Sequence, residues 1–171
     1  MIHVCSLSRL HGVVEETGAG HVVTLIKDVT RVRRPQSIRE ENHLILSLDD
    51  IEDDLEGMVA PAETHVADLL RFVDGWKREK PMVVHCFAGI SRSTAAAFIT
   101  ACAIQPERSE DEIARAIRAA SVTAQLNPRI VKFGDHLLGR KGRMVEAVRA
   151  IGKGSFGGTW IEEAEPFVIK I

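Results

Sequence analysis

At positions 81–93 the chain reads Pro81-Met82-Val83-Val84-His85-Cys86-Phe87-Ala88-Gly89-Ile90-Ser91-Arg92-Ser93. The apolar run at 82–85 has the length and composition of a short buried strand, and 93–104 is apolar on nearly every side, as a buried helix is. Cys86 therefore stands in a loop between a strand and the N-terminus of a helix. Because such a loop turns successive backbone N–H groups inward, the stretch predicts an anion-binding turn.

Three residues of this loop suit the cleavage of a phosphate ester by sulfur. A cysteine attacks as its thiolate, and the loop N–H groups and the helix N-terminus favour that form at Cys86. Gly89 can adopt positive φ and lets the backbone curl close to a ligand. Arg92 presents a planar fork to two phosphate oxygens, which a lysine cannot do.

The neighbours of the cysteine and arginine have supporting roles in this interpretation. Ser91 and Ser93 offer hydroxyls near the sulfur, and we assign Ser93 to stabilising the thiolate as it leaves a phosphocysteine intermediate. His85 is expected to be too buried for a general base, and we assign it to orienting the loop and tuning Cys86 through hydrogen bonds. The alternative is that His85 has only a structural role, as is usual for a histidine at a strand end.

The pattern His85-Cys86-x5-Arg92-Ser93 resembles the signature loop of the protein tyrosine phosphatase superfamily, and the run from Ala88 to Ser93 is most similar to its dual-specificity branch. A buried cysteine between a strand and a helix would explain the hydrophobicity, but not Gly, Arg and Ser at these offsets. The resemblance implies hydrolysis of phosphate monoesters through a phosphocysteine at Cys86. The phosphate would be bound by Arg92 and by the loop residues Phe87, Ala88, Gly89, Ile90 and Ser91. No metal or other cofactor is expected, because the thiolate replaces a metal-bound hydroxide.

The resemblance also implies an aspartic acid that protonates the leaving oxygen. Four candidates follow the strand predicted at 43–48, namely Asp49, Asp50, Asp53 and Asp54. We prefer Asp50, because a position next to a strand end fixes the carboxyl better than the middle of a loop. Asp54 fits the spacing of the family better and is the alternative general acid. At least two of the four are expected only to cap turns and solvate the loop.

Length and composition indicate a single globular domain that is large enough for an enzyme. The 171 residues are 45% hydrophobic and 27% charged, with a net charge of −2, which gives no reason to expect binding to nucleic acid or to a membrane. The three cysteines form neither a disulfide framework nor a metal-ligand spacing, and a catalytic thiol needs a reducing compartment. We therefore expect a cytoplasmic protein without a membrane span, and Cys102 is expected to fill the core.

Strand and helix patterns alternate along the chain, which predicts an α/β fold. We expect a central four- to five-stranded, mostly parallel sheet flanked by helices on both faces, as in dual-specificity phosphatases, with the ligand at the carboxyl end of the strand before Cys86. Strands are predicted at 2–6, 21–26, 43–48 and 82–85, and helices at 8–16, from Pro61 to before Pro81, at 93–104, after a Ser109 capping box, after Asn127-Pro128 and at 142–151.

Residues 1–152 are predicted to form the phosphatase domain, and 153–171 a flexible tail or an added edge strand. The segments 159–161 and 167–171 have strand composition and are expected to join the sheet edge or a partner, which would give a homodimer. Asn127 is interpreted as a helix N-cap, although it resembles, in reversed order, a Pro-Asn segment of dual-specificity phosphatases. A basic cluster consists of Arg31, Arg33, Arg34 and Arg39. Its side chains either are solvated in a loop or bind acidic substrates.

The expected substrate is a phosphorylated protein or a small phosphomonoester. The chain has no Trp-Pro-Asp sequence and no tyrosine, which indicates a shallow pocket, and the loop interior lacks the lysines that phosphoinositide phosphatases of this superfamily place there. Low-molecular-weight phosphatases carry their cysteine near the N-terminus, unlike Cys86. We therefore expect a phosphatase for phosphotyrosine, phosphoserine or phosphothreonine of proteins. A phosphatase for metabolites or nucleotides and a non-catalytic phosphate-binding module are the alternatives.

Overall fold

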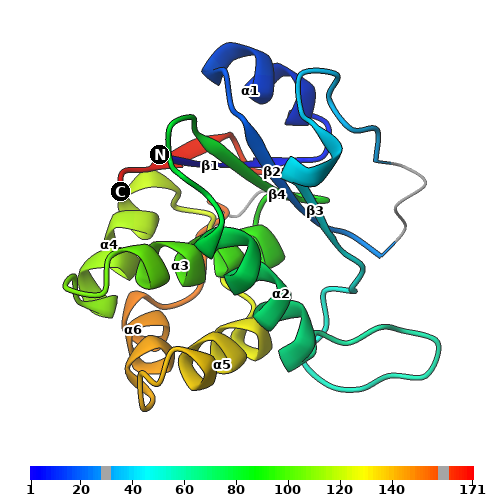
Figure 1. The fold of residues 1–171 in the computed structure, drawn as a ribbon. Coiled ribbons are helices and arrows are strands. Elements are labelled where there is room, and N and C mark those ends of the chain that lie inside the picture. The colour runs from blue at the N-terminus through cyan, green and yellow to red at the C-terminus, as the bar shows by residue number, and fades with distance from the viewer. Residues whose placement is uncertain (28–31, 158–161) are drawn as a thin grey trace.

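The computed structural model describes residues 1–27, 32–157 and 162–171 (Figure 1). Its strands are β1 (Ile2–Ser6), β2 (His21–Leu25), β3 (His43–Leu46), β4 (Met82–Cys86) and β5 (Phe167–Ile169). Its helices are α1 (Leu10–Thr17), α2 (Glu63–Asp74), α3 (Arg92–Ile104), α4 (Glu110–Ala120), α5 (Pro128–Leu137) and α6 (Arg143–Ile151), with a short 3₁₀ helix, η2, at Glu40–Asn42. The predicted alternation of strands and helices is confirmed.

The five strands form one sheet in the order β3-β2-β4-β1-β5. The pairs β1–β4, β2–β4 and β2–β3 are parallel, and β5 is antiparallel to β1. The central strand, β4, is buried along its whole length and ends at Cys86. This arrangement confirms the expected mostly parallel sheet and places the cysteine at its carboxyl edge.

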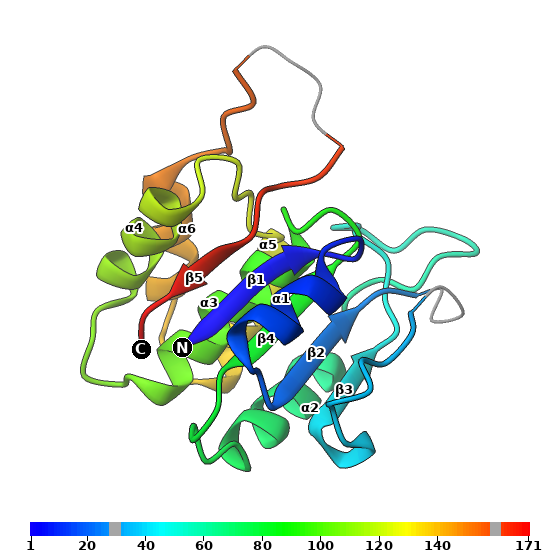
Figure 2. The same cartoon turned by 90° about the horizontal axis from the view of Figure 1, so that it is seen from above.

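Helices cover both faces of the sheet (Figure 2). On one face α1 packs against β1 and β4 through Leu10, Val13 and Val14. On the other face α3 lies against the sheet and is itself enclosed by α2, α4 and α5, which is why ten of its thirteen residues are buried. Enclosure on all sides explains a helix that is apolar around its circumference.

Several predicted elements are shorter than the sequence suggested: the helix predicted from Pro61 to before Pro81 spans only Glu63–Asp74, and two further boundaries have an identifiable cause. The strand predicted at 43–48 ends at Leu46, because its partner β2 ends at Leu25, the residue that pairs with Leu46. The helix predicted at 8–16 begins only at Leu10, because the hydroxyl of Ser8 donates to Glu163 and does not cap the helix. Both boundaries are decided by tertiary neighbours, which local patterns do not record.

The C-terminal segment adds a strand to the sheet. Phe167 and Ile169 are buried where β5 pairs with β1. Residues 167–169 therefore form an edge strand, which was one of the two predicted alternatives. The strand expected at 159–161 lies outside the described residues. The homodimer and the domain boundary at 152 stay predictions. None of the described helices is long and apolar enough to span a membrane.

Candidate active site

The first half of the loop after β4 is held from outside through its carbonyl groups. The N–H of Leu7, in the turn after β1, donates to the carbonyl of Phe87 at 3.1 Å, and the N–H of Ala164 donates to the carbonyl of Ala88 at 2.8 Å. In a trans peptide the N–H points opposite to the C=O. The N–H groups of Ala88 and Gly89 are therefore turned toward the inside of the loop.

The second half of the loop is held in the same way by the segment before α5. The N–H of Gln125 donates to the carbonyl of Ile90 at 2.9 Å, and the N–H of Asn127 to that of Ser91 at 3.4 Å. The amides of Ser91 and Arg92 consequently also face inward, at the N-terminus of α3. Such a set of inward N–H groups is an anion-binding cradle.

Gly89 is required in this loop for two reasons. Its φ of +74° is unfavourable for residues with a side chain. A Cβ atom at this position would also lie 2.8 Å from the carbonyl carbon of Cys5 and 2.9 Å from the nitrogen of Ser6. The loop therefore rests directly on the end of β1, and a larger residue would displace it.

Cys86 is the cysteine that reaches the cradle. Its Sγ lies 3.2 Å from the Oγ of Ser93, and the residue lines a cavity of about 910 Å³. Cys5 and Cys102 are buried away from it, and burial raises the pKa of both thiols to about 12. The core role expected for Cys102 agrees with this burial, and Cys86 alone combines a neighbouring hydroxyl with access to the cavity.

His85 belongs to a row of hydrogen-bonded side chains that crosses three strands. The Oγ1 of Thr24 lies 2.7 Å from the Nε2 of His85 and 2.8 Å from the Nε2 of His43. A hydroxyl has one proton, so it donates to one ring and accepts from the other. Burial lowers the pKa of His85 to about 4. The ring is thus neutral near pH 7 and is anchored to Thr24, as suits an orienting role.

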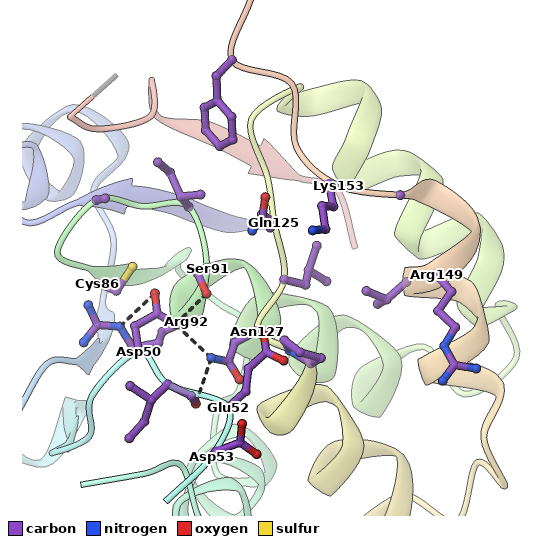
Figure 3. A pocket seen from close by; sticks show the side chains of 18 of the residues that line it. Asp50, Glu52, Asp53, Cys86, Ser91, Arg92, Gln125, Asn127, Arg149 and Lys153 are labelled. Atoms are coloured by element: carbon purple, nitrogen blue, oxygen red, sulfur yellow. Dashed lines mark hydrogen bonds and ion pairs between the residues drawn. The ribbon is translucent and has the colours of Figure 1, made fainter. Parts of the chain in front are cut away.

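Asp50 is brought to the cradle by residues distant in the sequence (Figure 3). Its Oδ1 accepts hydrogen bonds from Ser91 Oγ at 2.7 Å and from Asn127 Nδ2 at 2.9 Å. Its Oδ2 lies 3.8 Å from the Nε of Arg92, whose Nη1 donates to the carbonyl of Leu48 at 3.1 Å. Ser91 therefore holds the carboxylate, which differs from the place beside the sulfur that we expected for its hydroxyl.

The other three carboxyls of the acidic segment are placed differently. Asp49 pairs with Lys27 at 3.2 Å and accepts from the N–H of Val59 at 2.7 Å. Burial acts to raise the pKa of Asp49, but these two partners outweigh it and lower the pKa. Asp53 lines the cavity, whereas Asp54, the alternative acid, does not and pairs with Arg129 at 2.8 Å.

Known proteins resemble this chain in part of its sequence and in its fold. Residues 56–127 match the family described as protein-tyrosine phosphatase, and no curated protein sequence matches the chain. Similar solved structures include the human tyrosine phosphatase-like serine/threonine/tyrosine-interacting protein (18% identity, 82% of this chain and 92% of that chain, TM-score 0.63). Others are the Yvh1 phosphatase domain from Chaetomium thermophilum (21%, 84% and 93%, 0.62) and DUSP15 (17%, 88% and 89%, 0.61).

The segment that matches the protein-tyrosine phosphatase family contains the loop with Cys86 and Arg92 and covers less than half of the chain. The fold of the chain is similar to that of dual-specificity phosphatases, and at these identities the solved structures show the fold alone. The family match begins after Asp50, so the place of this carboxyl rests on the contacts described above.

One residue of this phosphatase-like site has a role that the sequence did not predict. Asn127 caps α5, since its Oδ1 accepts from the N–H of Ile130 at 3.1 Å, and at the same time its amide donates to Asp50. The N-cap interpretation is confirmed but incomplete. The only signal for the second role was the likeness to the Pro-Asn segment. Arg34 and Arg39 of the basic cluster make local contacts with Ile38 and Glu41. They do not line the cavity, and Arg31 lies outside the described residues.

The cavity extends well beyond the cradle. Its volume is about 910 Å³, and its far wall is formed by the end of α6 and the glycine-rich segment after it, with Val148, Lys153 and Phe156 among the lining residues. The sequence predicts that residues 153–171 are a flexible tail or an added edge strand, and not that this glycine-rich segment lines a site. Within the described ranges, no cluster of three or more His, Cys, Asp or Glu is placed to hold a metal ion.

Proposed function

We propose that this protein hydrolyses phosphate monoesters through a phosphocysteine at Cys86, with phosphorylated protein side chains as its first substrate class. The observation that carries the proposal is the conjunction of Cys86 and Ser93 at the base of a cradle of inward N–H groups with Arg92 and Asp50 beside it. Such an arrangement presents a nucleophile, an anion site and an acid to one phosphate group.

The first chemical step uses three of these groups. The thiolate of Cys86 attacks phosphorus and forms an S–P bond while the P–O bond to the leaving group breaks. Arg92 and the loop N–H groups hold the three remaining phosphate oxygens and the charge that they carry. Asp50, in its protonated form, donates its proton to the leaving oxygen, so that an alcohol or phenol departs.

The second step regenerates the enzyme. Water attacks the phosphorus of the phosphocysteine, the carboxylate of Asp50 accepts a proton from that water, and the S–P bond breaks to release inorganic phosphate. The hydroxyl of Ser93, 3.2 Å from the sulfur, donates to the departing thiolate. His85, neutral and bound to Thr24, takes no part in proton transfer in this scheme and holds the loop.

Exposed apolar side chains support a protein substrate. Phe87 on the phosphate loop, and Leu55, Met58 and Val59 on the segment that carries Asp50, are exposed large hydrophobic residues. Exposed apolar residues gathered around a site often mark a surface that binds another protein. A side chain presented from a protein would reach the cradle while the surrounding polypeptide covers these residues.

A second candidate is a small phosphomonoester with another anionic group. The observation that favours it is Lys153, whose ammonium points into the cavity in Figure 3. Arg149 of the same wall differs, because it is paired with Glu146 at 2.7 Å. A panel of phosphopeptides and of phosphometabolites separates the two candidates, and a preference of orders of magnitude in kcat/KM would decide between them.

The direct test of the proposed function is hydrolysis of an aryl phosphate in the presence of chelator and reductant. Cys86→Ser is expected to abolish turnover, because an alcohol is a far weaker nucleophile at neutral pH. Cys102→Ser is the matched control and should retain it. Turnover that survives Cys86→Ser would refute the cysteine mechanism.

A further inference from the structure

The C-terminal segment touches the phosphate loop at its first inward-facing amides. Ala164 is 3% exposed, and its N–H donates to the carbonyl of Ala88 at 2.8 Å. The same peptide unit carries the N–H of Gly89, which points the opposite way, into the cradle. The orientation of a phosphate-binding amide is thus tied to a residue three positions before β5.

The residue before Ala164 is anchored to the opposite end of the chain. The hydroxyl of Ser8 donates to Oε2 of Glu163 at 2.5 Å, and the hydroxyls of Ser8 and Ser6 lie 3.1 Å apart. The Ser8 and Ser6 hydroxyls lower the pKa of Glu163. The carboxylate is therefore ionised near pH 7, and its hydrogen bond with Ser8 is charge-assisted.

These contacts join into one support for the first half of the loop. The turn that holds Ser8 also supplies the N–H of Leu7 to the carbonyl of Phe87. Gly89 is the residue of the loop with positive φ and the fewest steric limits on its backbone. A peptide next to such a residue rotates easily unless hydrogen bonds fix it, and fixed donors are what makes a cradle bind its anion strongly.

We propose that Glu163 and Ala164 are positioning residues of the phosphate loop, so that the C-terminal segment is a working part of the active site. The inference rests on the proposed function, since it assigns the loop the task of holding a phosphate. Neither residue touches the phosphate itself. They act through the Ala88–Gly89 peptide, and their loss lets the N–H of Gly89 turn away from the anion.

Binding of vanadate, measured in the chain of residues 1–171, tests the inference without requiring turnover. Glu163→Ala is expected to weaken vanadate binding about threefold to tenfold, the loss typical of one ordinary hydrogen bond in a protein. Glu165→Ala, a nearby exposed carboxylate, is the matched control and should leave the affinity unchanged. Ser8→Ala should reproduce the effect of Glu163→Ala, and the double variant should lose no more than either single variant.

Ala164→Pro removes the backbone donor itself and is expected to weaken vanadate binding more than Glu163→Ala does, with Ala164→Gly, which keeps the N–H, as its control. The thermal midpoint is followed for every variant. A segment with only a structural role would lower that midpoint and leave the affinity of the folded protein unchanged, which would overturn the inference. Native protein that binds vanadate but hydrolyses no phosphate ester would refute the proposed function while leaving this comparison intact.

Discussion

Asp50 differs from the neighbouring carboxyls in what holds it. Two neutral donors, Ser91 and Asn127, fix one of its oxygens, and the other faces Arg92 across 3.8 Å. Asp54, by contrast, is paired with Arg129 outside the cavity. In the sequence, Asp50 is the preferred acid because it lies close to a predicted strand end, but β3 ends at Leu46. The carboxyl is fixed by side chains instead.

Asp50→Asn is expected to lower kcat by about 10²- to 10⁴-fold for poor leaving groups such as alkyl phosphates, and much less for nitrophenyl phosphate, because a good leaving group departs without a proton. The measurement is kcat for a series of phosphate esters whose leaving groups differ in basicity. Asp54→Asn serves as the control. If Asp54→Asn shows the leaving-group dependence and Asp50→Asn does not, the general acid is misassigned.

Asn127→Asp separates the two contacts of Asn127. An aspartate keeps the acceptor that caps α5 but replaces the amide donor to Asp50 with a second carboxylate. We expect kcat for alkyl phosphates to fall about tenfold, the loss typical of one hydrogen bond to a charged group, while the thermal midpoint stays near that of the native chain. Equal activity in native and variant protein would show that the amide does not position the acid.

Among the elements, β2, β3 and β4 are joined by side chains as well as by their backbones. The chain His43, Thr24, His85 crosses all three strands inside the fold. Its buried imidazole at His85 has a pKa lowered to about 4. Because this pKa is lowered on folding, the unfolded chain binds a proton at His85 in a pH range where the folded protein keeps the ring neutral.

Stability should therefore fall as the pH is lowered. Below about pH 6.5 the unfolded state takes up a proton at His85 while the folded state stays neutral until about pH 4. This difference amounts to about 2 kcal/mol between pH 7 and pH 5. Denaturant titrations at both pH values measure it, and His85→Gln should flatten the dependence. An equal free energy of unfolding at pH 5 and pH 7 would contradict the neutral, buried imidazole.

Element types were predictable because they follow from local patterns. The apolar run before Cys86, the capping box at Ser109 and Asn127 before Pro128 each mark an element that the structure contains. The capping box is present, with Ser109 accepting from the N–H of Glu112. The end of β3 and the start of α1 were misplaced, because a partner strand and Glu163 decide them.

For the complete fold, the contacts that could not be predicted join residues far apart in the chain. Asn127 and Asp50, or Ala164 and Ala88, meet only because the sheet brings the loops after β3 and β4, the start of α5 and the C-terminal segment to one edge. The loop that carries the proposed nucleophile could be predicted, because it lies within nine consecutive residues. The support of that loop could not, because it comes from both ends of the chain.

The measurement that decides whether Cys86 is the nucleophile is the trapping of the covalent intermediate. The protein is mixed with an aryl phosphate, quenched with acid within the first turnovers, digested and examined by mass spectrometry. We expect the mass of one phosphoryl group on the peptide that contains Cys86, and none on the peptides of Cys5 and Cys102, whose thiols have raised pKa values. Continued turnover with the phosphoryl group on another residue, or on none, would contradict the proposed mechanism.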